Sequence, residues 1–261
     1  MGFKCGIIGL PNVGKSSLFN ALVGLQKAAS ENYPFCTIEP NIGKVPIPDL
    51  RLKEISEVNN SRSVINAQIE FVDIAGLVKG ASRGEGLGNK FLSNIREVDA
   101  IAHVVRCFSD SNVTHVHNKV DPQYDIDIIE SELILSDLNR IENNIEKLSK
   151  QVKAGKKEFL NELKLLNKLQ SDLERGKVIS DQDLYSSEEN NFIKKLGLLS
   201  SKPMMYVANL DEDSIIEGNQ YSKMLSKIGR EKKVNVVLIS AKLESELSSI
   251  SNNEERLDLM K

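Results

Sequence analysis

Apolar residues in this chain form short, nearly unbroken runs that alternate with longer stretches of helical spacing. Unbroken runs of this length are typical of strands buried on both faces of a sheet, whereas apolar residues three and four apart indicate helices. The predicted strands are 3–8, 67–74, 100–108, 204–208 and 234–239, and the predicted helices are 15–25, 50–58, 89–98, one around 224–228 and one from 243 onward. Strands that alternate with helices predict a three-layer α/β domain.

The stretch 125–176 has a different pattern. Apolar residues from Ile134 to Val152 alternate four and three positions apart, which is typical of a coiled-coil seam. Ala154 and Gly155 interrupt the pattern, and a second apolar stripe follows up to Leu173. We therefore predict an antiparallel helical hairpin inserted into the α/β domain. The predicted division is 1–124 for the first part of that domain, 125–200 for the insertion and 201–261 for the second part.

The segment 9–16, GLPNVGKS, lies between the first predicted strand and the first predicted helix. It matches G-x-x-x-x-G-K-[ST], the phosphate-binding P-loop. Gly9 and Gly14 allow the tight turn that brings backbone N–H groups around phosphates. Lys15 is placed to reach the β- and γ-phosphates, and the Ser16 hydroxyl is placed to bind Mg²⁺. A purely structural glycine turn would not require this strand and helix on either side.

Two further segments contain candidate Mg²⁺ and γ-phosphate contacts. Asp73 ends the 67–74 strand in a D-x-x-G sequence, where the carboxylate would hold Mg²⁺ through water and the Gly76 N–H would meet the γ-phosphate. Thr37, in the loop before that strand, is the candidate second hydroxyl ligand. Loops of this kind order around the γ-phosphate and Mg²⁺ and relax after hydrolysis.

The sequence from Asn209 to Glu212 reads NLDE where GTPases usually have N-K-x-D. The lysine that packs along the base is Leu210 here, and the guanine-binding aspartate is a glutamate. Adenine has an acceptor at N1 and no 2-amino group, so a carboxylate gains nothing from it. The change weakens guanine recognition without proving adenine recognition. Ser240 and Ala241 begin an S-A-K sequence, which fits the loop whose backbone contacts the base.

Leu77 follows the D-x-x-G sequence, where many GTPases have a glutamine that orients the attacking water. A leucine cannot hydrogen-bond water, so we expect slow hydrolysis unless a cation or a partner supplies the missing contact. Asn12 is a candidate ligand for K⁺ in that role. The alternative is that Asn12 only stabilises the turn.

Composition excludes several classes of protein. The formal net charge of -3 argues against a generally basic nucleic-acid binder, and no apolar run approaches membrane-spanning length. Three widely spaced cysteines without C-x-x-C spacing favour a reducing, cytoplasmic compartment. His115 and His117 lack a third metal ligand nearby, and His103, within a predicted strand, is expected to be a packed core residue.

Five lysines and no acidic residue occupy 147–157, the predicted turn of the hairpin. Lysines bind phosphates without reading sequence. The segment is therefore either a solvated tip or a contact to RNA or the ribosome.

These motifs together resemble the YchF/Obg-like ATPase family of translation-factor-related P-loop proteins. The matching segments are 9–16 (GLPNVGKS), 32–40 (NYPFCTIEP), 71–82 (FVDIAGLVKGAS), 84–89 (GEGLGN) and 103–108 (HVVRCF). The resemblance implies a Ras-like G domain with a coiled-coil insertion, a preference for ATP over GTP, a hydrophobic residue at the glutamine position and association with ribosomes. The family continues into a TGS module, so we expect that this sequence stops before the end of its G domain and before that module.

Carried over by position, the resemblance implies that Leu210 lies at the adenine and that Ser16 and Thr37 bind Mg²⁺. The implied phosphate contacts are Asn12, Val13, Gly14, Lys15, Ser16 and Ser17. The first hypothesis is a monomeric, Mg²⁺-dependent ATPase that is slow in isolation. The second is a nucleotide-gated, ribosome-binding module with little hydrolysis, and the third is a conventional GTPase.

Overall fold

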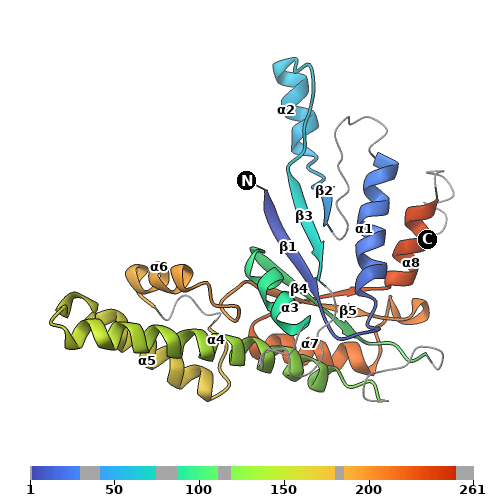
Figure 1. The fold of residues 1–261 in the computed structure, drawn as a ribbon. Helices are drawn as coiled ribbons and strands as arrows, with labels where there is room; N and C mark the ends of the chain where they lie inside the picture. The colour runs from blue at the N-terminus through green and yellow to red at the C-terminus, as the bar shows by residue number, and fades with distance from the viewer. Residues whose placement is uncertain (1, 30–41, 75–86, 111–118, 180–184, 251–261) are drawn as a thin grey trace.

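A computed structural model describes residues 2–29, 42–74, 87–110, 119–179 and 185–250. Its centre is a six-stranded sheet in the order β2-β3-β1-β4-β5-β6 (Figure 1). The strands are β1 (Phe3–Ile8), β2 (Ile42–Pro46), β3 (Gln68–Asp73), β4 (Ala100–Arg106), β5 (Met204–Asn209) and β6 (Asn235–Ile239). All neighbouring strands are parallel except β2, which is antiparallel to β3. The architecture confirms the predicted α/β fold.

Helices cover both faces of this sheet (Figure 1). They are α1 (Lys15–Ala29), α2 (Arg51–Asn59), α3 (Leu87–Arg96), α4 (Pro122–Lys153), α5 (Leu160–Glu174), α6 (Ser187–Leu196), α7 (Gln220–Lys232) and α8 (Ala241–Ser249), with 3₁₀ turns η3 (Lys157–Phe159) and η5 (Glu212–Ser214). Successive residues of β5 face opposite sides, because strand side chains alternate. Tyr206 and Ala208 join an apolar cluster with α4 and α7, whereas Val207 joins the cluster that contains α1.

Two elements were absent from the sequence-based prediction. Strand β2 was not predicted, and it is a short edge strand of five residues that pairs with β3 alone among the described strands. Helix α6 begins with a capping box, in which Ser186 and Glu189 bond reciprocally, and ends at Gly197 with φ 59°. Both α6 signals are visible in the sequence, but the apolar residues of the helix, Phe192, Ile193 and Leu196, all lie in its second half, so no apolar period runs along it.

Helix α2 lies where its spacing predicted a helix, yet it contains no buried residue. Together with the ends of β2 and β3, it projects away from the rest of the sheet (Figure 1). Helical spacing therefore predicted the helix correctly, but it did not reveal that none of the helix's residues is buried.

Helices α4 and α5 lie side by side and extend away from the sheet (Figure 1). The chain turns between them at Ala154 and Gly155, and Gly155 has φ 93°. Their facing sides share an apolar cluster that includes Ile141 and Leu169, both 0% exposed. The division into 1–124, 125–200 and 201–261 stays a prediction.

The buried Asp137 of α4 connects this helix to the segment before β5. Its carboxylate accepts hydrogen bonds from the backbone N–H groups of Leu199 and Ser200, both at 2.8 Å, and from Ser200 Oγ at 2.7 Å. Hydrogen bonds to a charged group are stronger than neutral ones. Asp137 therefore fixes the middle of α4 against the segment that leads into β5.

His103 lies in the middle of β4 and is fully buried, as predicted for a core residue. Its ring packs edge-on against Tyr206, with centroids 5.7 Å apart. Neither ring nitrogen has a hydrogen-bond partner among the described residues. Burial, together with the positive charges of Lys15 and Lys232, lowers the pKa of His103 from 6.5 to about 3. The folded protein therefore holds this imidazole neutral.

We predict that His103 makes the protein sensitive to acid. Because its pKa is lower in the folded state, the unfolded chain binds the proton first, and stability decreases as the pH falls below 6.5. Each pH unit in that window costs about 1.4 kcal/mol from this residue, or about 2 kcal/mol between pH 6.5 and 5. Urea unfolding at both pH values should show that His103→Leu loses less stability than the wild type. Equal losses in the two proteins would contradict the prediction.

Candidate functional site

The carboxyl ends of the parallel strands meet at one edge of the sheet. Strand register places Ile7 opposite Asp73, Arg106 opposite Asn209, and Asn209 opposite Ile239. Ligands of open α/β sheets bind outside this edge. The loop from β1 to α1, which is the predicted P-loop, begins at the same edge.

Backbone geometry explains the residue types in the P-loop. Gly9 and Gly14 have φ values of +151° and +97°, and Asn12 has φ 63°. A Cβ at Gly9 would lie 2.4 Å from the Val104 carbonyl oxygen. Asparagine tolerates the left-handed region better than most residues. This conformation accounts for an asparagine at position 12 whether or not it also binds K⁺.

Lys15 begins α1, and its side chain turns back toward the loop. Its Nζ donates a 2.7 Å hydrogen bond to the Leu10 carbonyl oxygen, and the residue is buried. Burial lowers the pKa of Lys15 from 10.5 to about 8, although the nearby Asp73 carboxylate opposes the shift. The ammonium group is desolvated and has only part of its charge compensated, so an anionic ligand would stabilise it.

Ser16 and Asp73 lie together, as their predicted shared role in Mg²⁺ binding requires. Ser16 Oγ donates a 2.9 Å hydrogen bond to Asp73 Oδ2. The other carboxylate oxygen, Asp73 Oδ1, is buried without a hydrogen-bond partner among the described residues. A hydroxyl and an unsatisfied carboxylate oxygen are donors that Mg²⁺ prefers. The two residues therefore fit a magnesium ion.

The described part of the chain has no cluster of three or more His, Cys, Asp or Glu residues that would hold a metal ion.

The Asn209 side chain joins the P-loop to the loop after β6. Its Nδ2 donates to the Val13 carbonyl oxygen at 2.9 Å, and its Oδ1 accepts from the Ala241 N–H at 2.9 Å. All of these groups are buried. A Cβ at Gly14 would lie 2.2 Å from Asn209 Nδ2, so glycine is required there for close approach. Asn209 therefore holds the P-loop against the loop after β6.

A cavity of about 870 Å³ opens beside these loops. Asn12, Gly14 and Ser17 line it, and Leu210 and Ala241 contribute apolar surface. Ser240 also lines it, and its side chain caps α8 by accepting from the Leu243 N–H. The volume lies in the range of small-molecule sites. The cavity is therefore bordered by all of the predicted base residues but by only three of the predicted phosphate contacts, since Val13, Lys15 and Ser16 are not among the residues that line it.

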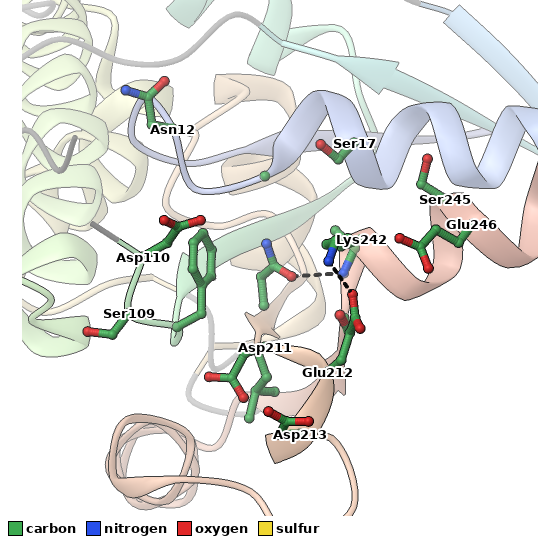
Figure 2. A pocket seen from close by; sticks show the side chains of 16 residues that line it. Asn12, Ser17, Ser109, Asp110, Asp211, Glu212, Asp213, Lys242, Ser245 and Glu246 are labelled. Carbon is green, nitrogen blue, oxygen red and sulfur yellow. Dashed lines mark hydrogen bonds and ion pairs between the residues drawn. The ribbon is translucent and has the colours of Figure 1, made fainter. Parts of the chain in front are cut away.

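Most of the charged residues that line this cavity are acidic, as Figure 2 shows. Its charged lining residues are Asp110, Asp211, Glu212, Asp213, Lys242 and Glu246. Asp211 caps η5 by accepting from the Ser214 N–H at 2.9 Å. Glu212 faces Lys242, with Oε1 and Nζ 2.8 Å apart.

Several residues of this lining were not among the predicted site residues. They are the segment 108–110, Asp211, Asp213, Lys242, Ser245 and Glu246. Phe108 is held by Arg106, whose guanidinium lies 4.4 Å from the ring centroid and donates to the Phe108 carbonyl oxygen. The apolar run 100–108 was a visible signal that this segment follows a strand at the ligand-binding edge.

Several predicted site residues lie outside the described residues. These are Thr37, Gly76 and Leu77, together with His115 and His117. Their assignments therefore stay predictions. No helix in the described residues is long and apolar enough to cross a membrane.

Comparison with known proteins places the chain in a family. A family model described as 50S ribosome-binding GTPase matches residues 4–160. The chain is 49% identical over 262 residues to the ribosome-binding ATPase YchF of Haemophilus ducreyi and 48% identical over 262 residues to that of Escherichia coli O157:H7. Each match covers 100% of this chain and 70% of the relative.

A solved structure supports the same assignment. The YchF GTPase of Schizosaccharomyces pombe has a TM-score of 0.83 and 37% sequence identity, over 98% of this chain and 70% of that one. The match extends through nearly all of the chain, including the strands and loops that border the cavity. The chain therefore belongs to the YchF family of P-loop GTPases.

Proposed function

We propose that this chain binds ATP with Mg²⁺ and hydrolyses it slowly, and that it prefers ATP to GTP. The observation that carries the proposal is the arrangement at one sheet edge of a desolvated Lys15 beside Ser16 and Asp73. Relatives of this chain are named ribosome-binding ATPases. Both points support a nucleotide-dependent role in the cytoplasm at the ribosome.

Catalysis would depend on position and charge more than on covalent chemistry. Water would attack the γ-phosphate while Lys15 and the P-loop N–H groups stabilise the negative charge that develops. Ser16 and Thr37 would hold Mg²⁺, with Asp73 acting through water. The bound ion would neutralise charge on the phosphates. Gly76 would contribute a backbone N–H to the γ-phosphate.

The rate would be low because Leu77 cannot orient water. We propose that K⁺ held by Asn12, or contact with the ribosome, supplies the missing stabilisation. The alternative function, a nucleotide-gated binding module with little hydrolysis, uses the same site without efficient chemistry.

The proposed ribosome contact is the turn between α4 and α5. Lys147, Lys150, Lys153, Lys156 and Lys157 are all exposed there. Lys150 pairs with Glu146 at 2.6 Å, an exposed pair that contributes little stability. Lysines grouped in this way suit a phosphate backbone better than a specific base sequence.

Nucleotide preference is the first test. In a competition experiment with labelled ATP and Mg²⁺, unlabelled ATP should displace the label at a lower concentration than GTP. The reason is that the position of the GTPase lysine is Leu210, while Glu212 is engaged by Lys242. A clear preference for GTP would contradict the proposal and favour a conventional GTPase.

Single-turnover hydrolysis is the second test. We expect slow conversion of ATP in Na⁺ buffer and faster conversion when K⁺ or ribosomes are added. Lys15→Ala is the matched control for contaminating activity, because it removes the phosphate-binding ammonium. If no condition gives turnover above that control, the binding-module alternative is correct.

Lys15 should also make nucleotide binding depend on pH. Its pKa of about 8 before binding means that the charged form predominates below pH 8 and is lost above it. Phosphates favour the charged form, so affinity should fall as the pH rises, roughly tenfold between pH 7.5 and 9. Calorimetric titration of the wild type and Lys15→Ala checks this. A wild-type affinity that does not change across this range would show that Lys15 is fully charged throughout.

A further inference from the structure

One ion pair joins two of the residues that line the cavity. Glu212 Oε1 and Lys242 Nζ are 2.8 Å apart, and Figure 2 shows the two side chains joined. Glu212 begins η5 after β5, and Lys242 lies in the first turn of α8 after β6. The pair therefore connects the two loops that border the proposed base position.

The backbones that carry the two side chains are both fixed. Asp211 caps η5 immediately before Glu212. The Ala241 N–H, immediately before Lys242, is bonded to Asn209 Oδ1 at 2.9 Å. Each side chain consequently starts from a rigid position, although both are substantially exposed at 40% for Glu212 and 74% for Lys242.

Lys242 is the only cation among the 16 described residues that line the cavity. Its ammonium group is surrounded by acceptors. A hydrogen bond to Glu212 and the charge of that carboxylate raise the pKa of Lys242, and Glu246 and Asp110 add to the shift. The ammonium is therefore charged at all physiological pH values and is held toward the carboxylate.

The ion pair presents a hydrogen-bond donor at the proposed base position, where a GTPase presents a carboxylate acceptor. A guanine base presents N1–H and a 2-amino group, both donors, and requires a free carboxylate. Adenine presents an acceptor at N1 and requires a donor. An ammonium group has three N–H donors, and pairing with one carboxylate leaves others available.

We propose that Lys242, positioned by Glu212, is a specificity-determining residue that favours adenine over guanine. Lys242 pairs with the Glu212 carboxylate, which guanine would need as an acceptor. Its ammonium group presents an N–H donor toward the adenine N1 acceptor. This inference rests on the proposed function, in which ATP is the preferred nucleotide. Only backbone contacts to the base are expected from the S-A-K loop, and the Lys242 side chain would add a further contact.

The test measures Mg-ATP and Mg-GTP affinities of the full chain by calorimetric titration. Lys242→Ala should lower the ratio of ATP to GTP affinity about tenfold, which is the lower range for a hydrogen bond to a charged group. ATP should bind more weakly and GTP more tightly. Lys242→Arg keeps the charge and should retain most of the ATP preference.

A double variant separates the two parts of the mechanism. If Lys242→Ala improves GTP binding by freeing the carboxylate, then Lys242→Ala combined with Glu212→Gln should lose that improvement. Lys227→Ala is the matched control, because Lys227 forms an exposed ion pair with Glu231 on α7 and does not line the cavity. It should leave both affinities unchanged.

The outcomes distinguish this inference from the proposed function. If the wild type prefers ATP and Lys242→Ala changes the ratio less than twofold, the role of Lys242 is wrong and the ATP preference stands. If the wild type shows no preference for ATP, the proposed selectivity fails and the role of Lys242 fails with it. Because the substitutions are at exposed side chains, thermal unfolding should give the same midpoint for all variants.

Discussion

The two buried hydrogen bonds of the Asn209 side chain hold the site together. One amide group accepts from the loop after β6 and donates to the P-loop, each at 2.9 Å. Loss of this side chain would leave a buried carbonyl and a buried N–H unpaired, at about 1–3 kcal/mol each. The contact is possible only because Gly14 has no Cβ. The Asn209 contact therefore requires a glycine at position 14, although 195 positions separate the two residues.

Charge in the site depends on this fixed frame. On the phosphate side, Lys15 is desolvated and bonded to a backbone carbonyl, and Asp73 keeps one oxygen without a partner among the described residues. On the base side, Glu212 and Lys242 form an ion pair, with Oε1 and Nζ 2.8 Å apart. The first arrangement suits a ligand with negative charge and a divalent cation. The second suits a base that accepts a hydrogen bond at N1.

Much of this structure could be predicted from the sequence because its signals are local. The P-loop lies between a strand and a helix, and Asp73 and Asn209 each end a strand, so these motifs located the edge of the sheet. The missed features depend on tertiary partners. Strand β2 is defined by pairing with β3, and the contact between Glu212 and Lys242 joins residues 30 positions apart. No spacing rule reveals such a contact.

The central claim is that Lys15, Ser16 and Asp73 bind a magnesium–triphosphate complex. A crystal structure of the chain with Mg²⁺ and a non-hydrolysable ATP analogue tests it most directly. The account predicts that Lys15 Nζ leaves the Leu10 carbonyl, now 2.7 Å away, and contacts the β- and γ-phosphates. Ser16 Oγ should turn from Asp73 to the metal, with adenine beside Leu210. A bound nucleotide that leaves the Lys15–Leu10 and Ser16–Asp73 hydrogen bonds intact would contradict the account.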